Sequence, residues 1–206
     1  MDKKYIYYTE QENVYYKNEL IKSITEFMNY TKSEDFMGII LRAQIYIEND
    51  LDILLSKLLI QPKKIKLQFF AAKLDAVYAL GAIDEGWYGV FRKFNSVRNK
   101  CAHDFKYEFT ESDYIDLIST LSKSNKQEYT FILKQEEFFN KLIDSYQNTL
   151  TPMDLYLKLR ILLSELMLYI KQQHQGIEYL WKEIDCIKQE QILENKLDLL
   201  KKLSNT

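Results

Sequence analysis

The stretch from Asp84 to Phe105 limits what this chain can fold into more than any other. Its apolar residues recur every three or four positions, the spacing of an α-helix with one buried face. At about 100° per residue they form one narrow stripe that we expect to face the core: Val90, Phe94, Val97, Cys101 and Phe105. The opposite side is polar and carries Tyr88, Arg92, Asn95, Asn99 and His103, with Arg98 on a flank. The stretch therefore predicts an amphipathic helix with a histidine on its outer face.

Residues that form turns are scarce along the whole chain. Only five glycines and two prolines occur among 206 residues, which favours an all-α fold. A chain of this length suits one domain, or one domain with an extension, and can bury a sizeable core. We expect a helical domain over residues 1–175 and a C-terminal amphipathic helix over residues 176–206.

Capping signals and apolar spacing predict where the helices begin and end. The expected helices run from the Thr9 capping box to about Tyr30, from Asp35 to about Ile60, from about Ile65 to Leu80, from Asp84 to Phe105, from Thr110 to about Leu121, from about Tyr129 to Asn148 and from Thr151 to about Gln173. Gly81 suits a left-handed cap, and the polar residues 122–128 predict a loop. Gly176 is expected to interrupt the last helical pattern.

The helix expected after Asp35 is apolar on two sides. One side carries Ile40, Ala43, Ile47, Leu51, Leu54 and Leu58, and the other carries Leu41, Ile45, Leu55 and Leu59. Such a helix is either central in a bundle or shares its second face with another subunit. Its polar exceptions are Arg42, Glu48 and Asn49, which we expect to form ion pairs or hydrogen bonds within the bundle.

The tail from Ile177 to Leu203 is a long amphipathic pattern with a polar interruption at residues 188–191. Its clean heptads are too few to predict a coiled coil. The tail can dock on the bundle or pair with a helix of a protein partner, and the sequence leaves both open.

Several classes of protein are disfavoured. The net charge of -2 gives no overall attraction to nucleic acid or anionic lipid, so binding of either needs a local patch. The N-terminal sequence lacks the apolar core of a signal peptide, and no uncharged run is long enough to span a bilayer. We therefore expect a cytoplasmic protein that is not bound to a membrane.

The sequence lacks the motifs of most known cofactor and metal sites. Cys101 and Cys186 have no second Cys or His at metal-ligand spacing, and we expect Cys101 to be a buried structural thiol. The sequence contains no glycine-rich phosphate loop, no G-x-S-x-G elbow and no cluster of His and carboxylates. We expect neither a cofactor nor a metal.

The remaining candidate is the element Arg98-Asn99-x-x-x-His103. Arginine offers a permanent planar charge, histidine transfers protons near neutral pH, and asparagine can orient a group by hydrogen bonding. These residue types handle phosphate, and they share the outer side of the expected helix near its end. Arg98, Asn99 and His103 are therefore the candidate catalytic residues.

The sequence F-R-K-F-N-S-V-R-N-K-C-A-H resembles the R-x4–6-H signature of the HEPN superfamily, whose members are helical domains and in many cases metal-independent ribonucleases. The chain is similar in particular to the mannitol operon repressor-like family of that group. The matching stretches are L-R-A-Q-I-Y-I-E-N-D-L-D-I-L-L, F-F-A-A-K-L-D-A-V-Y-A-L-G-A-I, V-R-N-K-C-A-H-D-F and L-T-P-M-D-L-Y-L-K-L-R-I-L-L-S, between about Met37 and Ile170. The resemblance implies a HEPN-like helical bundle with additional C-terminal helices.

The resemblance implies two functions. As a metal-independent ribonuclease of the kind found in toxin and defence systems, the chain would use His103 as acid and base for attack of a ribose 2′-hydroxyl on the adjacent phosphate, with Arg98 stabilising the developing charge. Asn99 would orient the substrate or His103. As a repressor-like transcriptional regulator, the chain would bind protein or nucleic acid without catalysis. A third interpretation is structural: His103 contacts the carbonyls at its helix end, and Arg98 pairs with a nearby acid.

An active site would need two chains. On an ideal helix Arg98 and His103 differ by about 140° in direction, so one helix alone forms a poor clamp. A two-fold axis near the outer side of this helix would bring two copies of Asn99 and His103 into one groove. The resemblance implies the same arrangement, because HEPN ribonucleases commonly form composite sites at a dimer interface. We therefore expect a homodimer with RNA as substrate.

Overall fold

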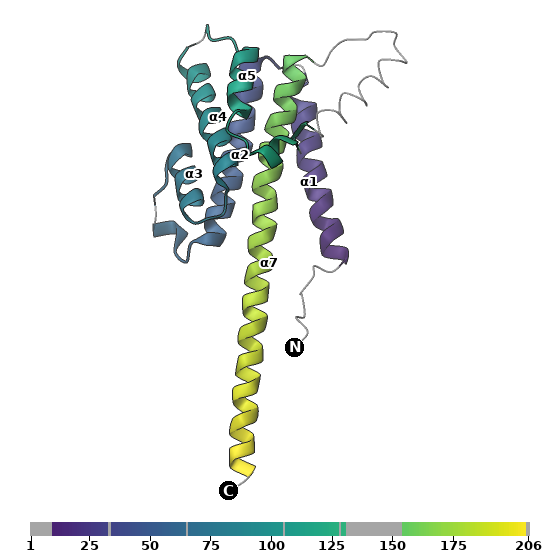
Figure 1. Cartoon of the computed structure of the whole chain (residues 1–206), viewed down its shortest axis with the longest axis vertical. Helices are drawn as coiled ribbons and strands as arrows, with labels where there is room; N and C mark the ends of the chain where they lie inside the picture. Colours follow the sequence, from purple (N-terminus) through teal and green to yellow (C-terminus); the bar gives the residue numbers. More distant parts are fainter. Residues whose placement is uncertain are drawn as a thin grey trace.

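The structure is a computed structural model that describes residues 10–32, 34–64, 66–104, 106–127, 129–130 and 154–204. All regular elements in these ranges are helical, so the all-α prediction is confirmed (Figure 1). In chain order the elements are α1 (Glu10–Tyr30), α2 (Phe36–Leu58), the 3-10 helix η1 (Pro62–Lys64), α3 (Phe70–Ala79), α4 (Glu85–His103), α5 (Glu111–Ile118) and α7 (Leu155–Ser204). Residues 123–127 and 129–130 are helical as well.

The centre of the bundle is α2, which contacts α3, α4 and α7. Its buried apolar residues come from a wide surface: Ile39, Ile40, Ala43, Ile47, Leu51, Leu54 and Leu55. On the second predicted face Leu55 is buried, Leu41 and Leu59 are half-buried, and Ile45 is exposed. The prediction of a central helix is therefore confirmed, and neighbouring helices of the same chain cover much of both faces.

The predicted starts of three helices are confirmed by capping bonds. Asp35 Oδ1 accepts a hydrogen bond from Gly38 N at 2.8 Å at the start of α2. At the start of α4, Asp84 Oδ1 accepts one from Trp87 N at 3.1 Å. Thr110 forms a complete capping box at the start of α5. Each cap satisfies a backbone N–H that the first turn of a helix leaves free, which is why short-range sequence signals located these boundaries.

The predicted left-handed cap at Gly81 is also confirmed. Gly81 has a φ of 76°, and the backbone N–H of Ala82 donates to Val77 O at 3.2 Å. This bond, together with the one from Gly81 N to Tyr78 O at 2.9 Å, is the pattern of a Schellman motif. The tight end of α3 turns the chain directly into the cap of α4.

The predicted start of α3 was wrong. The sequence pattern placed it at about Ile65, whereas the helix begins at Phe70 and η1 lies before it. Phe69 is extended, with φ -112° and ψ 143°, and its side chain makes no capping bond. The residues just before it are used to cross from the end of α2 to the start of α3, so the apolar spacing there does not reflect a helix.

The predicted loop over residues 122–128 was also wrong, since residues 123–127 are helical. Ser122 Oγ accepts a hydrogen bond from Asn125 N at 3.1 Å, and Ser122 O accepts one from Lys126 N at 2.9 Å. Ser122 therefore caps a short helix in a stretch whose polarity predicted a loop. The helix predicted from Tyr129 to Asn148 lies largely outside the described residues.

The last helix differs from its prediction at both ends. In the described residues α7 begins at Leu155, and Asp154 Oδ1 accepts a hydrogen bond from Leu157 N at 2.8 Å as its cap. The predicted cap, Thr151, lies outside the described residues. The helix then runs to Ser204 without interruption, because Gly176 is an ordinary helical residue here. The expected domain boundary at residues 175–176 therefore falls inside α7.

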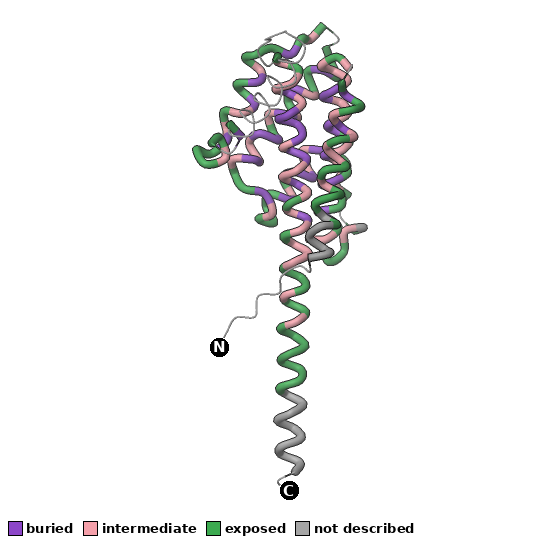
Figure 2. Tube along the Cα trace, turned by 90° about the vertical axis from the view of Figure 1, so that its right-hand side faces the viewer, coloured by how far each residue is buried: buried purple, intermediate pink, exposed green. Residues whose placement is uncertain are grey.

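The first half of α7 packs in the bundle, and the second half projects from it (Figures 1 and 2). Residues 159–170 supply seven of the buried core side chains, Leu159, Ile161, Leu162, Leu163, Leu166, Met167 and Ile170. Between residues 182 and 194 the helix is mostly exposed. Within the described ranges, no helix is both long enough and apolar enough to cross a membrane.

Candidate functional site

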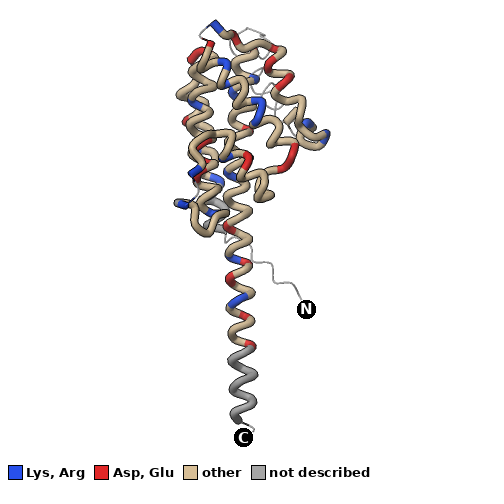
Figure 3. Tube along the Cα trace, turned by 90° about the vertical axis from the view of Figure 1, so that its left-hand side faces the viewer, with Lys and Arg blue, Asp and Glu red and all other residues tan. Residues whose placement is uncertain are grey.

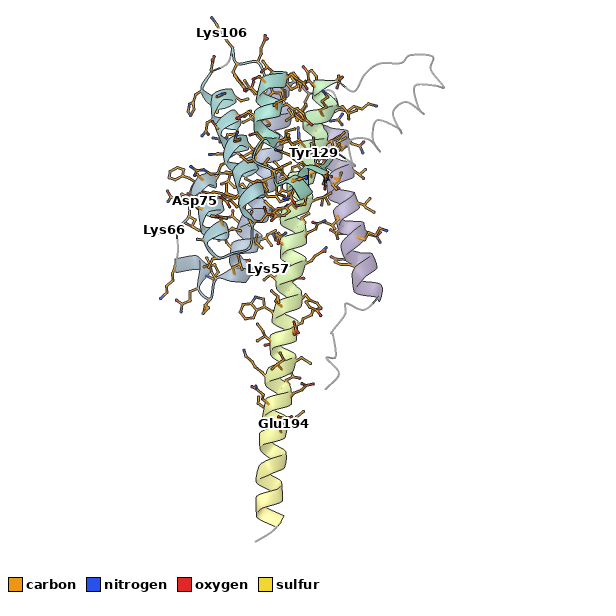
Figure 4. All side chains as sticks on the ribbon, viewed as in Figure 1. Lys57, Lys66, Asp75, Lys106, Tyr129 and Glu194 are labelled. Carbon is orange, nitrogen blue, oxygen red and sulfur yellow. The ribbon has the colours of Figure 1, made fainter. Side chains whose placement is uncertain are left out.

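The predicted core stripe of α4 fixes where its polar residues point. Val90, Phe94, Val97 and Cys101 are all buried, as predicted, while Phe105 lies outside the described residues. Trp87 and Phe91 are buried too and pack against Tyr169 of α7. With this side of α4 held in the core, Asn99 and His103 are exposed and Arg98 is half-buried. His103 ends α4 at the end of the molecule that carries Lys106, opposite the projecting part of α7 that carries Glu194 (Figure 4).

Arg98 is held by two hydrogen bonds. Its Nε donates to Gln44 Oε1 of α2, and its Nη1 donates to Asn99 Oδ1 at 2.9 Å. Two of the three predicted site residues are therefore joined directly. The orientation of the guanidinium is set by a side chain of another helix, and this could not be predicted from the spacing along α4.

Gln44 belongs to a larger polar cluster between α2, α3 and α4. Its Nε2 donates to Glu48 Oε2 at 3.2 Å, and Glu48 Oε1 accepts from Lys73 Nζ at 3.0 Å. Lys73 also donates to Asp52 Oδ2 at 2.8 Å. Burial lowers the pKa of Lys73, but the bonds to Asp52 and Glu48 outweigh it and leave that pKa raised. Lys73 is therefore a charged side chain that ties α3 to α2.

The sequence had predicted internal ion pairs for the polar residues of α2, and two of them are present. Glu48 pairs with Lys73, and Arg42 pairs with Glu34. Asn49 is exposed. Both pairs link α2 to residues outside it, which agrees with a structural role.

His103 is joined to neither of the other predicted site residues. It is exposed, and among the described residues no hydrogen bond or ion pair involves its side chain. The backbone at this helix end is satisfied instead by Asp104 N, which donates to Lys100 O at 2.8 Å. The imidazole is thus accessible to a bound molecule, and one chain does not assemble Arg98, Asn99 and His103 into one contact group.

These contacts bear on the structural interpretation of the motif. That interpretation expected His103 to contact the terminal carbonyls and Arg98 to pair with an acid. The partners of Arg98 are the amides of Gln44 and Asn99, and no such contact of His103 is found in the described part of the chain. Arg98 does have a structural contact, but its charge has no carboxylate partner within the part of the chain that the structure describes.

The thiol of Cys101 does not contribute to this surface. Cys101 is buried, and burial raises the pKa of its thiol. A thiol held in its neutral form is a poor nucleophile, so its predicted structural role is consistent with its surroundings.

The charge around the site is mixed. Lys100 is exposed, lies 3.5 Å from Asp113 and stands over the ring of Tyr107. On the side of the molecule shown in Figure 3, acidic and basic residues are interspersed over the bundle and along α7. Attraction of a polyanion to this site therefore depends on its own basic groups, such as Arg98 and Lys100.

An open hollow of about 750 Å³ lies at the other end of α4. It is lined by Asp84, Glu85, Gly86, Thr120 and Ser122, among others. None of the predicted site residues lines it, since they belong to the last two turns of α4. Within the described ranges, no three His, Cys, Asp or Glu side chains are grouped as a metal site would require.

The second histidine was not singled out by sequence reasoning. His174 of α7 is 8% exposed, and its Nε2 lies 2.8 Å from the backbone oxygen of Asp50. Because a carbonyl can only accept, Nε2 carries the proton. Burial lowers the pKa of His174 to about 4. The carboxyl of Asp50, whose pKa burial raises, pairs with Lys171 Nζ at 3.0 Å.

Comparison of the chain with protein-family models, with curated proteins and with solved structures gave no match. The fold and the contacts of the candidate residues are therefore the basis for a functional proposal.

Proposed function

We propose that this protein is a metal-independent endoribonuclease that uses Arg98, Asn99 and His103. The observation that supports the proposal best is the state of these side chains on the last turns of α4. Arg98 is oriented by two amide oxygens and has no carboxylate partner among the described residues, while His103 is exposed one and a half turns away. A fixed cation and an accessible imidazole are the two groups that cleavage of a phosphodiester requires.

In the proposed reaction the ribose 2′-oxygen attacks the adjacent phosphorus. His103 removes the proton of the 2′-hydroxyl, a bond forms between the 2′-oxygen and phosphorus, and the bond from phosphorus to the 5′-oxygen breaks. The 5′-oxygen takes up, as it leaves, the proton that His103 removed from the 2′-hydroxyl, so the imidazole returns to its neutral form. The products are a 2′,3′-cyclic phosphate and a 5′-hydroxyl, and Arg98 stabilises the negative charge on the phosphate oxygens. Every step uses side chains of the protein alone.

The proposed active unit is a homodimer. Arg98 turns toward α2 to meet Gln44, whereas His103 points to solvent at the helix end, so the two do not converge in one chain. A two-fold axis beside this end of α4 would pair the Arg98 of one chain with the His103 of the other. RNA would then lie in the groove between the two helices.

Purified protein incubated with tRNA and mRNA in EDTA tests the proposal. We expect cleavage that leaves a 2′,3′-cyclic phosphate, and no cleavage where the ribose before the scissile phosphate lacks its 2′-hydroxyl. His103→Ala is expected to slow cleavage by roughly 10²–10⁴-fold, because it removes the group that transfers protons. Arg98→Ala should slow it as well.

Arg92→Ala is the matched control for Arg98→Ala. Arg92 is an exposed arginine of the same helix, and its partner is Asp75 at 3.2 Å. It should keep full activity. Absence of cleavage across these RNAs, or equal cleavage by the wild type and His103→Ala, would exclude the proposed activity.

Mixing Arg98→Ala with His103→Ala chains tests the two-chain site. If each active site takes Arg98 and His103 from opposite chains, the mixture regains part of the activity that each variant lacks. Sedimentation at micromolar concentration should show a dimer, and a strict monomer would contradict the two-chain site.

The second candidate is a non-catalytic regulator that binds a protein or nucleic acid. The observation that favours it is the projecting part of α7, whose exposed apolar residues could contact a partner: Leu180, Trp181, Ile184, Ile187, Ile192 and Leu193. The same RNA assay separates the candidates, because a regulator leaves the RNA intact.

A further inference from the structure

A chain of hydrogen bonds crosses three helices and ends on Arg98. Lys73 Nζ of α3 donates to Glu48 Oε1 at 3.0 Å, and Gln44 Nε2 donates to Glu48 Oε2 at 3.2 Å. Arg98 Nε of α4 then donates to Gln44 Oε1. Gln44 and Lys73 are each 8% exposed, so water competes little for these bonds. The cluster is therefore a rigid support beneath a half-buried guanidinium.

Arg98 at one end of this cluster and the carboxylate of Glu48 at the other determine the direction of the hydrogen bonds between them. An arginine can only donate and a carboxylate can only accept, so the amide of Gln44 must turn its oxygen to Arg98 and its nitrogen to Glu48. One orientation of Gln44 satisfies both partners. A side chain that both donates and accepts is required at this position, and glutamine supplies it at the right length.

The amide of Gln44 also separates the positive charge of Arg98 from the negative charge of Glu48. Glu48 is paired with Lys73, which in turn contacts Asp52, so the acidic groups of the cluster have their own cation. Among the described residues, Arg98 contacts the neutral side chains of Gln44 and Asn99 and no carboxylate. A carboxylate in place of the amide would form an ion pair with Arg98 and weaken its attraction for an external anion. The arrangement orients the guanidinium without neutralising it.

We propose that Gln44 is the positioning residue for Arg98 and that Glu48 and Lys73 hold Gln44 in place. The proposal rests on the proposed ribonuclease function, because it assigns the oriented Arg98 to the phosphate of the RNA. Gln44 touches neither RNA nor His103 in this scheme. It acts by fixing the direction from which Arg98 meets the phosphate, so its effect on cleavage must pass through Arg98.

Substitution of Gln44 together with Arg98 tests this dependence. Gln44→Met keeps the length of the side chain and removes both hydrogen bonds, and we expect kcat/KM for RNA cleavage to fall about tenfold or more, the effect of losing one bond to a charged group. In an Arg98→Ala background the same substitution should have no further effect. Asn49→Ala, at an exposed position of the same helix, is the control and should keep the wild-type rate.

A role of Gln44 in stability alone predicts a different result. The loss of activity would then be the same with and without Arg98, and that result would overturn the proposal. Unchanged cleavage by Gln44→Met would overturn it too. If Gln44→Met does not fold, Gln44→Asn replaces it, because its amide is one methylene too short to reach both partners.

A nuclear magnetic resonance measurement separates this proposal from the proposed function. The Nε–H signal of Arg98 should exchange slowly with water in the wild type and in His103→Ala, and quickly in Gln44→Met. If the wild type cleaves no RNA but the signal behaves in this way, the proposed function fails and the positioning of Arg98 by Gln44 stands. If the signal of Gln44→Met exchanges as slowly as that of the wild type, the positioning role is wrong, whatever the activity.

Discussion

At the scale of single residues, the two histidines have opposite surroundings. His103 is exposed at the end of α4, whereas His174 is buried between α7 and α2 and donates to Asp50 O. Burial disfavours the charged imidazole, and this lowers the pKa of His174 from its ordinary value of 6.5 to about 4. The bond to Asp50 O, which opposes this shift, is the smaller effect. His174 therefore contributes to stability as a neutral hydrogen-bond donor.

The pKa of His174 predicts a loss of stability in mild acid. Between pH 6.5 and 4 the unfolded chain binds a proton at His174 that the folded protein does not, so the free energy of unfolding falls as the pH is lowered through this range. The contribution of His174 is fully present above pH 6.5, and lowering the pH from 7 to 5 should remove about 2 kcal/mol of it. Urea unfolding at the two pH values measures the change.

His174→Gln isolates this contribution, because glutamine can donate to Asp50 O but does not titrate. We expect the variant to lose less stability than the wild type between pH 7 and pH 5. The raised pKa of Asp50 acts in the opposite direction in both proteins and so leaves their difference unchanged. An equal loss in the two proteins would show that His174 is not the group responsible.

At the scale of the elements, two helical glycines have different reasons to be glycine. A Cβ on Gly89 of α4 would lie 2.7 Å from Thr120 Cβ and 2.8 Å from Thr120 Oγ1, just beyond α5. A Cβ on Gly176 of α7 would meet nothing within 4 Å. The first glycine permits the close approach of two segments, and the second only lowers the helix propensity.

Substitution by alanine should therefore have opposite effects at these positions. Gly89→Ala should lower the free energy of unfolding by about 1–3 kcal/mol, because Thr120 and its backbone must move. Gly176→Ala should raise it by up to about 1 kcal/mol, since alanine favours a helix and nothing blocks its methyl group. Thermal unfolding of both variants checks the pair. A gain in stability for Gly89→Ala would mean that the contact with Thr120 is loose.

The helices that could be predicted from sequence are those whose ends depend on neighbouring residues. The caps at Asp35, Asp84 and Thr110 satisfy backbone groups three residues away, and Gly81 closes its own helix end. The start of α3 and the passage of α7 through Gly176 depend on how distant elements pack, and those predictions were wrong. The cap at Ser122 is local, but the polarity of its surroundings concealed it.

Part of the candidate site could likewise be predicted from the sequence, and part of it could not. Helical spacing correctly predicted that Asn99 and His103 are exposed and Cys101 is buried. Helical spacing could not predict the hydrogen bond between Arg98 and Gln44, because the packing of α2 on α4 brings these two residues together. The presence of a glutamine among apolar residues, in the middle of a helix expected to be central, is the one signal that could have indicated a buried polar partner.

At the scale of the whole molecule, α7 both completes the core and leaves it. Near the point where α7 leaves the bundle it is tied to Lys57 of α2, whose Nζ pairs with Glu178 Oε1 at 2.5 Å and whose backbone oxygen accepts from Trp181 Nε1 at 3.2 Å. Ile177 is half-buried against the core. Residues 184–194 are exposed or half-exposed along the projecting helix (Figure 2).

Two truncations of α7 should separate these parts. A chain that ends after Glu183 keeps Ile177 and the contacts with Lys57. Because residues 184–194 are exposed or half-exposed, its free energy of unfolding should stay within about 0.5 kcal/mol of the wild type. A chain that ends after Gly176 loses them and should be about 1–3 kcal/mol less stable, from the lost apolar burial and the lost ion pair. Urea unfolding at several protein concentrations measures both.

The same measurement tests whether the projecting helix is a subunit interface. Association stabilises a folded chain in proportion to the logarithm of its concentration. If the wild type becomes more stable with rising concentration and the chain ending after Glu183 does not, the projecting helix is such an interface. The projecting helix would then contribute to stability, contrary to this prediction, and the two-fold axis of the dimer would lie along α7 and away from the end of α4.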